Sequence, residues 1–109
     1  MILDNRKKDE LVSIGGEAFF LEMLDKFIAQ TVDILKQCRT ARDAGDRERV
    51  KGLLHKLKGS SLTVGTADVA DHVLSAYEKS AREMVAVEDL DSIQTALAAL
   101  VNHRKTMPT

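Results

Sequence analysis

The stretch LLHKLKGSSLTVGT contains one histidine, His55, among lysines, serines and glycines whose spacing could support chemistry. If the stretch is helical, with about 3.6 residues per turn, His55 lies opposite the apolar residues and faces solvent. Gly52 and Gly59, three positions before it and four after, share that outward side, and Lys51 and Lys58 lie along its flank. An exposed imidazole with nearby cations and bare backbone on both adjacent turns suits a nucleophile that takes an anionic group from another protein.

Phosphoryl transfer is the reaction that fits His55 best, because positioning and charge stabilisation do most of its catalytic work. The ammonium of Lys58 could lie against the phosphoryl oxygens, and Arg47, one turn before Lys51, extends the positive strip. Most lone surface histidines have no such role. However, a glycine inside an exposed helix costs about 1 kcal/mol relative to alanine. Two glycines beside one histidine therefore indicate that a partner must come close to the ring.

Glycines define the elements that must hold this histidine in place. The only proline, Pro108, lies next to the end of the sequence and interrupts no helix before it. Helix stops and caps are expected where a glycine or a short polar side chain can end or begin a helix: at Asp4, at Gly15 and Gly16, at Gly45 and Asp46, and at Gly65 and Thr66. The predicted helices span residues 4–14, 17–43, 46–64, 66–84 and 88–105.

Each long segment carries one stripe of apolar residues at spacings of three and four, as in an amphipathic helix. The stripes are, in chain order, Phe20, Leu24, Phe27, Leu35 and Cys38; Val50, Leu53, Leu54, Leu57, Ser61 and Val64; Val73, Leu74, Tyr77 and Ala81; and Leu90, Ile93, Leu97 and Leu100. Amphipathic helices with short connections pack as antiparallel neighbours. The predicted fold is therefore all-α, an antiparallel up-down-up-down four-helix bundle with a short extra N-terminal helix, in a single domain over residues 1–109.

The composition restricts the classes of partner. Among 109 residues, 16 are lysine or arginine and 17 are aspartate or glutamate, so the net charge is −1. This balance favours neither nucleic acid nor direct membrane contact, and no apolar run reaches the roughly 20 residues of a transmembrane helix. We expect a cytoplasmic monomer whose single cysteine, Cys38, is buried among apolar residues.

The histidines are poorly spaced for a metal site. His55, His72 and His103 are 17 and 31 positions apart, and the chain has no second cysteine, whereas zinc ligands come in close pairs. We therefore predict no metal ion and no cofactor of the chain's own. A serine–histidine dyad is excluded as well, because Ser61 belongs to the apolar stripe and Ser60 lies about 140° round the helix from His55.

The segment HKLKGSSLTVGT resembles the motif of the histidine-containing phosphotransfer (HPt) domains of multistep phosphorelays, in which His-x-Leu-Lys-Gly-Ser precedes a helix-ending glycine. The matching positions are His55, Leu57, Lys58, Gly59, Ser60 and Gly65. The upstream stretch FFLEMLDKFIAQTVDILKQCRTARDAGDRERV is similar to the family's preceding helix and AGD turn, so the resemblance covers most of the chain. The sequence departs from the family at Leu54 and Thr66, where alanine is more frequent, and at Ala76 and Tyr77, where a Leu-Glu pair is common.

This resemblance implies that His55 is phosphorylated, that Lys58 holds the phosphoryl oxygens and that Gly59 admits the partner. The implied partners are response-regulator receiver domains, which supply an acidic pocket and its Mg²⁺. The residues that we expect to contact a receiver are Lys51, Gly52, Gly59 and Leu62. Domains of this family often close a hybrid sensor histidine kinase, here one of the RpfC type, which would make the domain the cytosolic end of a membrane-bound kinase.

The main alternative is a helical interaction module that docks a receiver-like domain or a partner helix without ever being phosphorylated. Incubation with a phosphorylated receiver domain separates the two hypotheses. A histidine kinase fits poorly, because the sequence has no Gly-rich nucleotide loop. In addition, Lys56 follows His55 at the position where kinase dimerisation helices usually carry an acidic residue.

Overall fold

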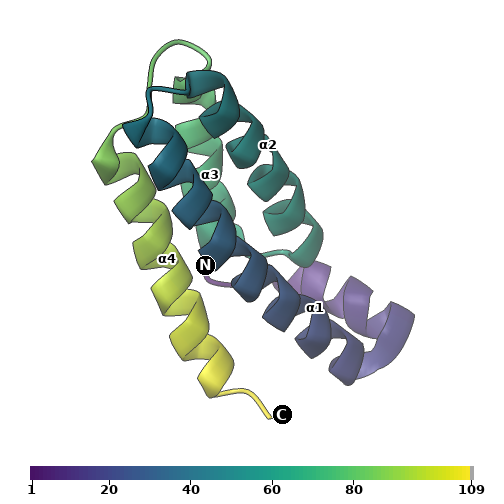
Figure 1. The fold of residues 1–109 in the computed structure, drawn as a ribbon. Helices are drawn as coiled ribbons and strands as arrows, with labels where there is room; N and C mark the ends of the chain where they lie inside the picture. Colours follow the sequence, from purple (N-terminus) through teal and green to yellow (C-terminus); the bar gives the residue numbers. More distant parts are fainter. Residues whose placement is uncertain (109) are drawn as a thin grey trace.

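The computed structural model describes residues 1–108, which form a bundle of four helices and no strand (Figure 1). In chain order the helices are α1 (Asn5–Asp43), α2 (Arg47–Val64), α3 (Ala67–Ser80) and α4 (Val87–Lys105). Helix α1 packs against α2 and α4, and α3 packs against the same two helices. The bundle is elongated, with extents of 42 × 21 × 19 Å. The predicted all-α four-helix bundle is confirmed, and no helix within these residues is both long and apolar enough to span a membrane.

Gly16 divides α1 into a short N-terminal helix and a long helix that belongs to the bundle. Its φ of 88° and ψ of 177° lie outside the helical region, and glycine adopts a positive φ without steric cost. In Figure 1 the N-terminal part of α1, drawn in purple, is set at an angle to the remainder. The predicted break at Gly15 and Gly16 and the predicted short extra helix are therefore both present.

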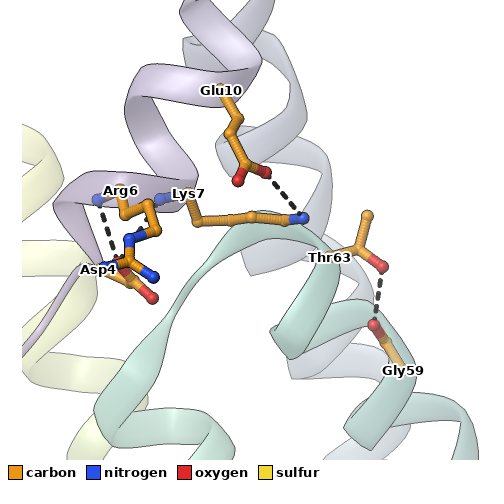
Figure 2. A network of polar contacts seen from close by, with 6 residues as sticks. All are labelled: Asp4, Arg6, Lys7, Glu10, Gly59 and Thr63. Atoms are coloured by element: carbon orange, nitrogen blue, oxygen red, sulfur yellow. Dashed lines mark hydrogen bonds and ion pairs between the residues drawn. The ribbon is translucent and has the colours of Figure 1, made fainter.

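The N-terminal helix begins at a side-chain cap that lies beside the turn between α2 and α3. Asp4 Oδ1 accepts hydrogen bonds from the backbone N–H groups of Arg6 and Lys7, at 3.0 and 3.4 Å (Figure 2). The Asp4 N–H donates to the Gly65 carbonyl at 2.8 Å. Gly65 has a φ of 81°, and a Cβ there would come within 2.7 Å of the Lys7 Cβ. Glycine is therefore required where the first segment of the chain crosses the end of α2.

The predicted apolar stripes form the core, with few exceptions. All of the stripe residues on α1 and α4 are buried, as are those on α2 apart from Leu53, which is half-buried. Full burial of a leucine or phenylalanine contributes about 1.5–3 kcal/mol, so these stripes dominate the stability of the bundle. On α3, Val73 is buried, whereas Leu74 and Tyr77 are only half-buried.

The predicted helix over residues 66–84 is too long at its C-terminal end. Helix α3 ends at Ser80, and the chain then turns inward so that only 1% of Val85 is exposed. The Val85 carbonyl accepts a hydrogen bond from Arg42 Nε of α1 at 2.9 Å. These long-range contacts outweigh the high helix propensity of the four intervening residues, Ala81, Arg82, Glu83 and Met84. Ala81, predicted to line the apolar face, is exposed in this turn.

The predicted caps of the middle helices work in two different ways. Asp46 Oδ1 accepts from the Arg49 N–H at 3.1 Å, so the predicted cap of α2 is confirmed. Thr66 directly precedes α3, but its side chain makes no capping hydrogen bond to that helix. Its hydroxyl donates to the Ser61 carbonyl at 3.3 Å instead. The Thr66 hydroxyl therefore adds a third donor to the Ser61 carbonyl, which already accepts from the N–H groups of Gly65 and Thr66.

Candidate functional site

Helix α2 has one buried, mostly apolar face and one exposed face. Packing of the buried face determines where the exposed face points. The residues on the packed face, all buried, are Val50, Leu54, Leu57, Ser61 and Val64. His55, Gly52 and Gly59 are exposed on the opposite side, as the helical spacing predicts. Because the apolar face is locked into the core, the outward residues keep a defined position although they are not part of the core.

The imidazole of His55 packs against the ring of Tyr77, which comes from α3. The two ring centroids are 5.5 Å apart and the ring planes are inclined by 44°, which lies within the range of favourable aromatic pairs. The hydroxyls of Ser60, Ser61 and Thr63 donate to backbone carbonyls of α2 rather than to the His55 ring. The imidazole is therefore supported from the α3 side and open on the other.

The two glycines leave the α2 backbone uncovered on both sides of His55. Within residues 1–108, a Cβ added at Gly52 or Gly59 would meet nothing within 4 Å except its chain neighbours and the backbone of its own helix. Neither glycine has a positive φ, so the local conformation does not require glycine. Figure 2 shows Gly59 in a regular turn of the helix, where its carbonyl accepts from Thr63 Oγ1 at 2.9 Å. The two glycines therefore leave open space on the surface that no other feature of α2 requires.

Two lysines of α2 lie beside His55. Lys58 Nζ lies 4.9 Å from the centroid of the Tyr77 ring, which is a cation–π contact. Lys51 lines a depression of about 310 Å³ whose other walls are Glu48, Gly52, His55 and Tyr77. None of the ion pairs within residues 1–108 includes either lysine. Both ammonium groups are therefore available to an anion that approaches His55.

A larger groove, of about 570 Å³, lies between α1 and α2. It is lined by Met23, Lys26, Phe27 and Gln30 of α1 and by Lys56, Gly59, Ser60, Thr63 and Val64 of α2. Gly59 belongs both to this groove and to the outward face, so the groove extends up to the surface that carries His55. Its lining combines apolar side chains with two lysines.

The predicted site residues fall into three places on the molecule. Lys51, Gly52 and His55 line one depression, and Lys58 reaches the same Tyr77 ring from the next turn of α2. Gly59 lies on the groove between α1 and α2. Leu62 lines neither hollow, but 50% of its surface is exposed on α2.

Tyr77 belongs to this site, whereas its spacing on α3 predicted a core residue. It is half-buried, and its ring contacts both His55 and Lys58. The sequence contains a signal for this contact, because α2 and α3 are antiparallel around the turn at Gly65. His55 stands ten positions before that glycine and Tyr77 twelve after it, so the two residues reach the same level of the helical hairpin.

The arrangement can serve nucleophilic group transfer. An exposed imidazole can attack an electrophilic phosphorus or carbon, and adjacent ammonium groups stabilise negative charge that gathers on the transferred group. Within residues 1–108 no three histidine, cysteine, aspartate or glutamate side chains are grouped so that they could hold a metal ion.

Sequence and fold comparisons place the chain in a known class. Its sequence matches the family model of the Hpt domain over residues 22–103. A crystal structure from rice, described as a candidate histidine-containing phosphotransfer protein, has the same fold, with a TM-score of 0.85 at 20% sequence identity. That match covers 97% of this chain and 80% of the rice chain. No curated protein matches the sequence.

The fold and the family match together define a histidine phosphotransfer domain built as a four-helix bundle. The family match covers well over half of the sequence and includes α2, α3 and most of α4. The chain belongs to the Hpt domain family. The resemblance seen in the sequence motif is thereby confirmed at the level of the family.

Proposed function

We propose that this domain carries its phosphoryl group on His55, accepting it from the aspartate of one receiver domain and passing it to the aspartate of a second. The observation that carries the proposal is the combination of clearance and positive charge at this histidine. Gly52 and Gly59 leave open space along α2 on both sides of the ring. Lys51 and Lys58 provide the positive charge that an incoming phosphoryl group needs.

In the accepting step, a nitrogen of the neutral His55 imidazole attacks the phosphorus of the aspartyl phosphate. The phosphorus–oxygen bond breaks and leaves its electron pair on the carboxylate, a phosphorus–nitrogen bond forms, and the proton of the other ring nitrogen passes to water. The passing step runs in reverse on the second receiver. Because the chemistry needs little covalent assistance, positioning and charge stabilisation determine its rate.

Lys58 is the residue that we assign to the phosphoryl oxygens. Its ammonium lies over the Tyr77 ring, 4.9 Å from the centroid, and the same ring contacts His55. A phosphoryl group attracts an ammonium more strongly than an aromatic ring does, because its oxygens carry full negative charge. The receiver would supply the acidic pocket and the Mg²⁺, which neutralises the charge of the transferred group.

The receiver would dock on the outward face of α2, with Lys51, Gly52, Gly59 and Leu62 among the contact residues. Lys51 complements the acidic pocket of a receiver and steers its approach. Leu62, with 50% of its surface exposed, offers apolar area on the same helix. The two glycines allow the partner's backbone and side chains to come down to the level of the ring.

A two-stage transfer experiment tests the proposal. Receiver domains are phosphorylated with phosphoramidate, freed of the reagent and mixed with this chain, and the labelled chain is then purified and mixed with a second receiver. We expect the chain to gain phosphate in the first stage and to lose it in the second. If the chain binds receivers but never becomes labelled, it is a docking module without phosphotransfer activity, and the proposal is wrong.

A further inference from the structure

We propose that Tyr77 is a positioning residue for phosphoryl transfer, which orients the His55 imidazole and holds the Lys58 ammonium beside it. This inference rests on the proposed function of His55. One ring makes both contacts: its centroid is 5.5 Å from that of the imidazole and 4.9 Å from Lys58 Nζ. The nucleophile and the cation thus belong to α2, while the side chain that connects them belongs to α3.

Tyr77 is suited to this role because it is anchored on one side and accessible on the other. It is half-buried and packs against the hydrophobic core, and its helix is fixed by the buried side chains of Val73 and Ala76. A tyrosine side chain has only two main torsions, so a core contact is enough to fix its ring. The exposed His55 has no comparable anchor of its own and takes its orientation from the ring beside it.

The Tyr77 ring restrains the position of the Lys58 ammonium, which in an ordinary surface lysine is free to move. A lysine side chain has several free torsions and loses much rotamer entropy when it is confined. Lys58 enters none of the ion pairs within residues 1–108, so the Tyr77 contact is what restrains its ammonium on the ring that also contacts His55. A preorganised cation stabilises the transferring group, because its side chain does not have to reorient during the reaction.

An aromatic ring also has an advantage over a carboxylate at this position. A carboxylate would bind the Lys58 ammonium more tightly and would place a negative charge beside an incoming anionic group. The face of a tyrosine ring attracts a cation through its quadrupole and carries no net charge. Tyr77 can therefore hold Lys58 in the resting state and release it to the phosphoryl oxygens when the group arrives.

A small phosphodonor separates positioning from docking. Phosphoramidate transfers its phosphoryl group to the imidazole directly, with cleavage of its phosphorus–nitrogen bond and departure of ammonia, which takes up the imidazole proton. The rate of His55 labelling in the full chain is followed by mass spectrometry for the parent, Tyr77→Leu and Tyr77→Phe. We expect Tyr77→Leu to be slower by about fivefold, as for the loss of one exposed cation–π contact, and Tyr77→Phe, which keeps the ring, to retain most of the rate.

A double-mutant cycle shows whether Tyr77 acts through Lys58. The rate loss in the double variant Tyr77→Leu, Lys58→Ala should be smaller than the product of the two single losses, because both substitutions remove the same cation from the site. A parental rate in Tyr77→Leu, an equal loss in Tyr77→Phe, or fully multiplicative losses would each overturn the positioning role. If the parent takes up phosphate on a histidine other than His55, the proposed function itself is wrong.

A spectroscopic measurement on the unmutated chain does not depend on any variant folding. An ammonium side chain held over an aromatic face has its ε-methylene proton resonances shifted upfield by the ring current. We expect this shift for Lys58 in the NMR spectrum of the parent, and its retention in Tyr77→Phe. Ordinary random-coil shifts for Lys58 in the folded parent would show that the contact is not maintained in solution and would overturn the inference.

Discussion

Two exposed histidines on neighbouring helices, His55 on α2 and His72 on α3, have surroundings of opposite charge. The walls of the 310 Å³ depression around His55 are Glu48, Lys51, Gly52 and Tyr77, and Lys58 lies over the same tyrosine. The walls of the 350 Å³ depression around His72 are Glu88, Asp91, Ser92 and Thr95. Near His55 the two ammonium groups outnumber the single carboxylate of Glu48, so a phosphoryl group is attracted, whereas the two carboxylates near His72 repel it. Exposure alone therefore does not define a phosphoacceptor.

The backbone beside the two histidines differs as well. The positions three before and four after His55 are Gly52 and Gly59, both exposed and open. The corresponding neighbours of His72 are Val69 and Ala76, which are only 1% and 2% exposed. His72 thus lies at the edge of a packed face, whereas His55 stands in the middle of an uncovered one. The difference supports the proposal that α2 presents its histidine to another molecule.

The largest expected effect comes from replacing each of the two histidines by glutamine in a separate variant. His55→Gln should abolish phosphate uptake from a phosphorylated receiver, whereas His72→Gln, the matched control, should be labelled like the parent. Both variants should keep the parental helical circular dichroism and melting temperature, because neither ring contributes to the core. Labelling of His55→Gln on any other histidine would contradict the comparison between the two sites.

Gly59→Gln tests whether the uncovered backbone serves the partner. The variant should melt at or above the parental temperature, with a gain of about 0.5–1 kcal/mol, because glutamine is the better helix former and a Cβ there meets no neighbour. Transfer from a receiver should fall by about a hundredfold if the side chain displaces the partner by about 1 Å. Phosphoramidate, which needs no docking, should be affected far less. A destabilised variant, or one with parental transfer, would remove the argument for clearance.

Lys58→Ala should slow phosphate uptake by about tenfold without abolishing it, since the nucleophile remains and only a charge that stabilises the transferring group is lost. The matched control is Lys36→Ala, which removes the same charge from an exposed position on α1. The two rates are measured with phosphoramidate, so that docking plays no part. Equal rates in the two variants would show that Lys58 has no specific role.

The acidic residues at the start of α4 are expected to stabilise the helix without affecting transfer. Asp89 Oδ2 accepts from the Ala86 N–H at 2.7 Å and from Lys79 Nζ at 2.9 Å. Partial desolvation raises the pKa of Asp89. The hydrogen bonds from Lys79 and the Ala86 N–H lower it by more than this rise, so the pKa lies below its ordinary value. The carboxylate therefore adds stability above the ordinary pKa of an aspartate, and this stability is lost as the pH falls through the lowered pKa.

Asp89→Ala should accordingly cost about 1 kcal/mol at neutral pH, a value typical of a lost helix cap. Thermal melts of the variant and the parent should converge as the medium is acidified below the normal range of aspartate titration. Phosphate uptake by His55 should stay at the parental rate at neutral pH. A stability difference that does not depend on pH would show that the charge of Asp89 is irrelevant.

Cys38 is a nucleophilic side chain in the opposite situation from His55. It is completely buried, and burial raises the pKa of its thiol to about 11, although Arg49 and Arg39 partly counteract the rise. Because the thiolate is the reactive form, iodoacetamide at pH 8 should modify Cys38 rapidly in urea and hardly at all in the folded chain. Rapid modification without denaturant would show that the core opens around α1.

Most of the fold could be predicted from the sequence because its determinants are local. The apolar stripes of α1, α2 and α4 and the glycine turns at Gly16, Gly45 and Gly65 depend on residues close together in the chain. The end of α3 could not be predicted in this way. It depends on the burial of Val85 and on its hydrogen bond to Arg42, a residue 43 positions away.

The candidate site could also be predicted only in those features that depend on a single helix. The outward direction of His55 and the openness at Gly52 and Gly59 follow from the periodicity of α2 alone. The contacts of Tyr77 depend on how α3 is registered against α2, which a single-helix pattern does not contain. The placement of the domain at the end of a hybrid sensor kinase of the RpfC type stays a prediction from the motif.

The position of the phosphate on the parent chain decides whether His55 is the phosphoacceptor. The chain is mixed with a phosphorylated receiver, digested at alkaline pH to preserve the phosphorus–nitrogen bond, and its peptides are sequenced by tandem mass spectrometry. We predict one modified residue, His55, in a peptide that includes the sequence GLLHK. Phosphate on His72 or His103, or no phosphate on any histidine although the receiver loses its own, would show that His55 is not the phosphoacceptor.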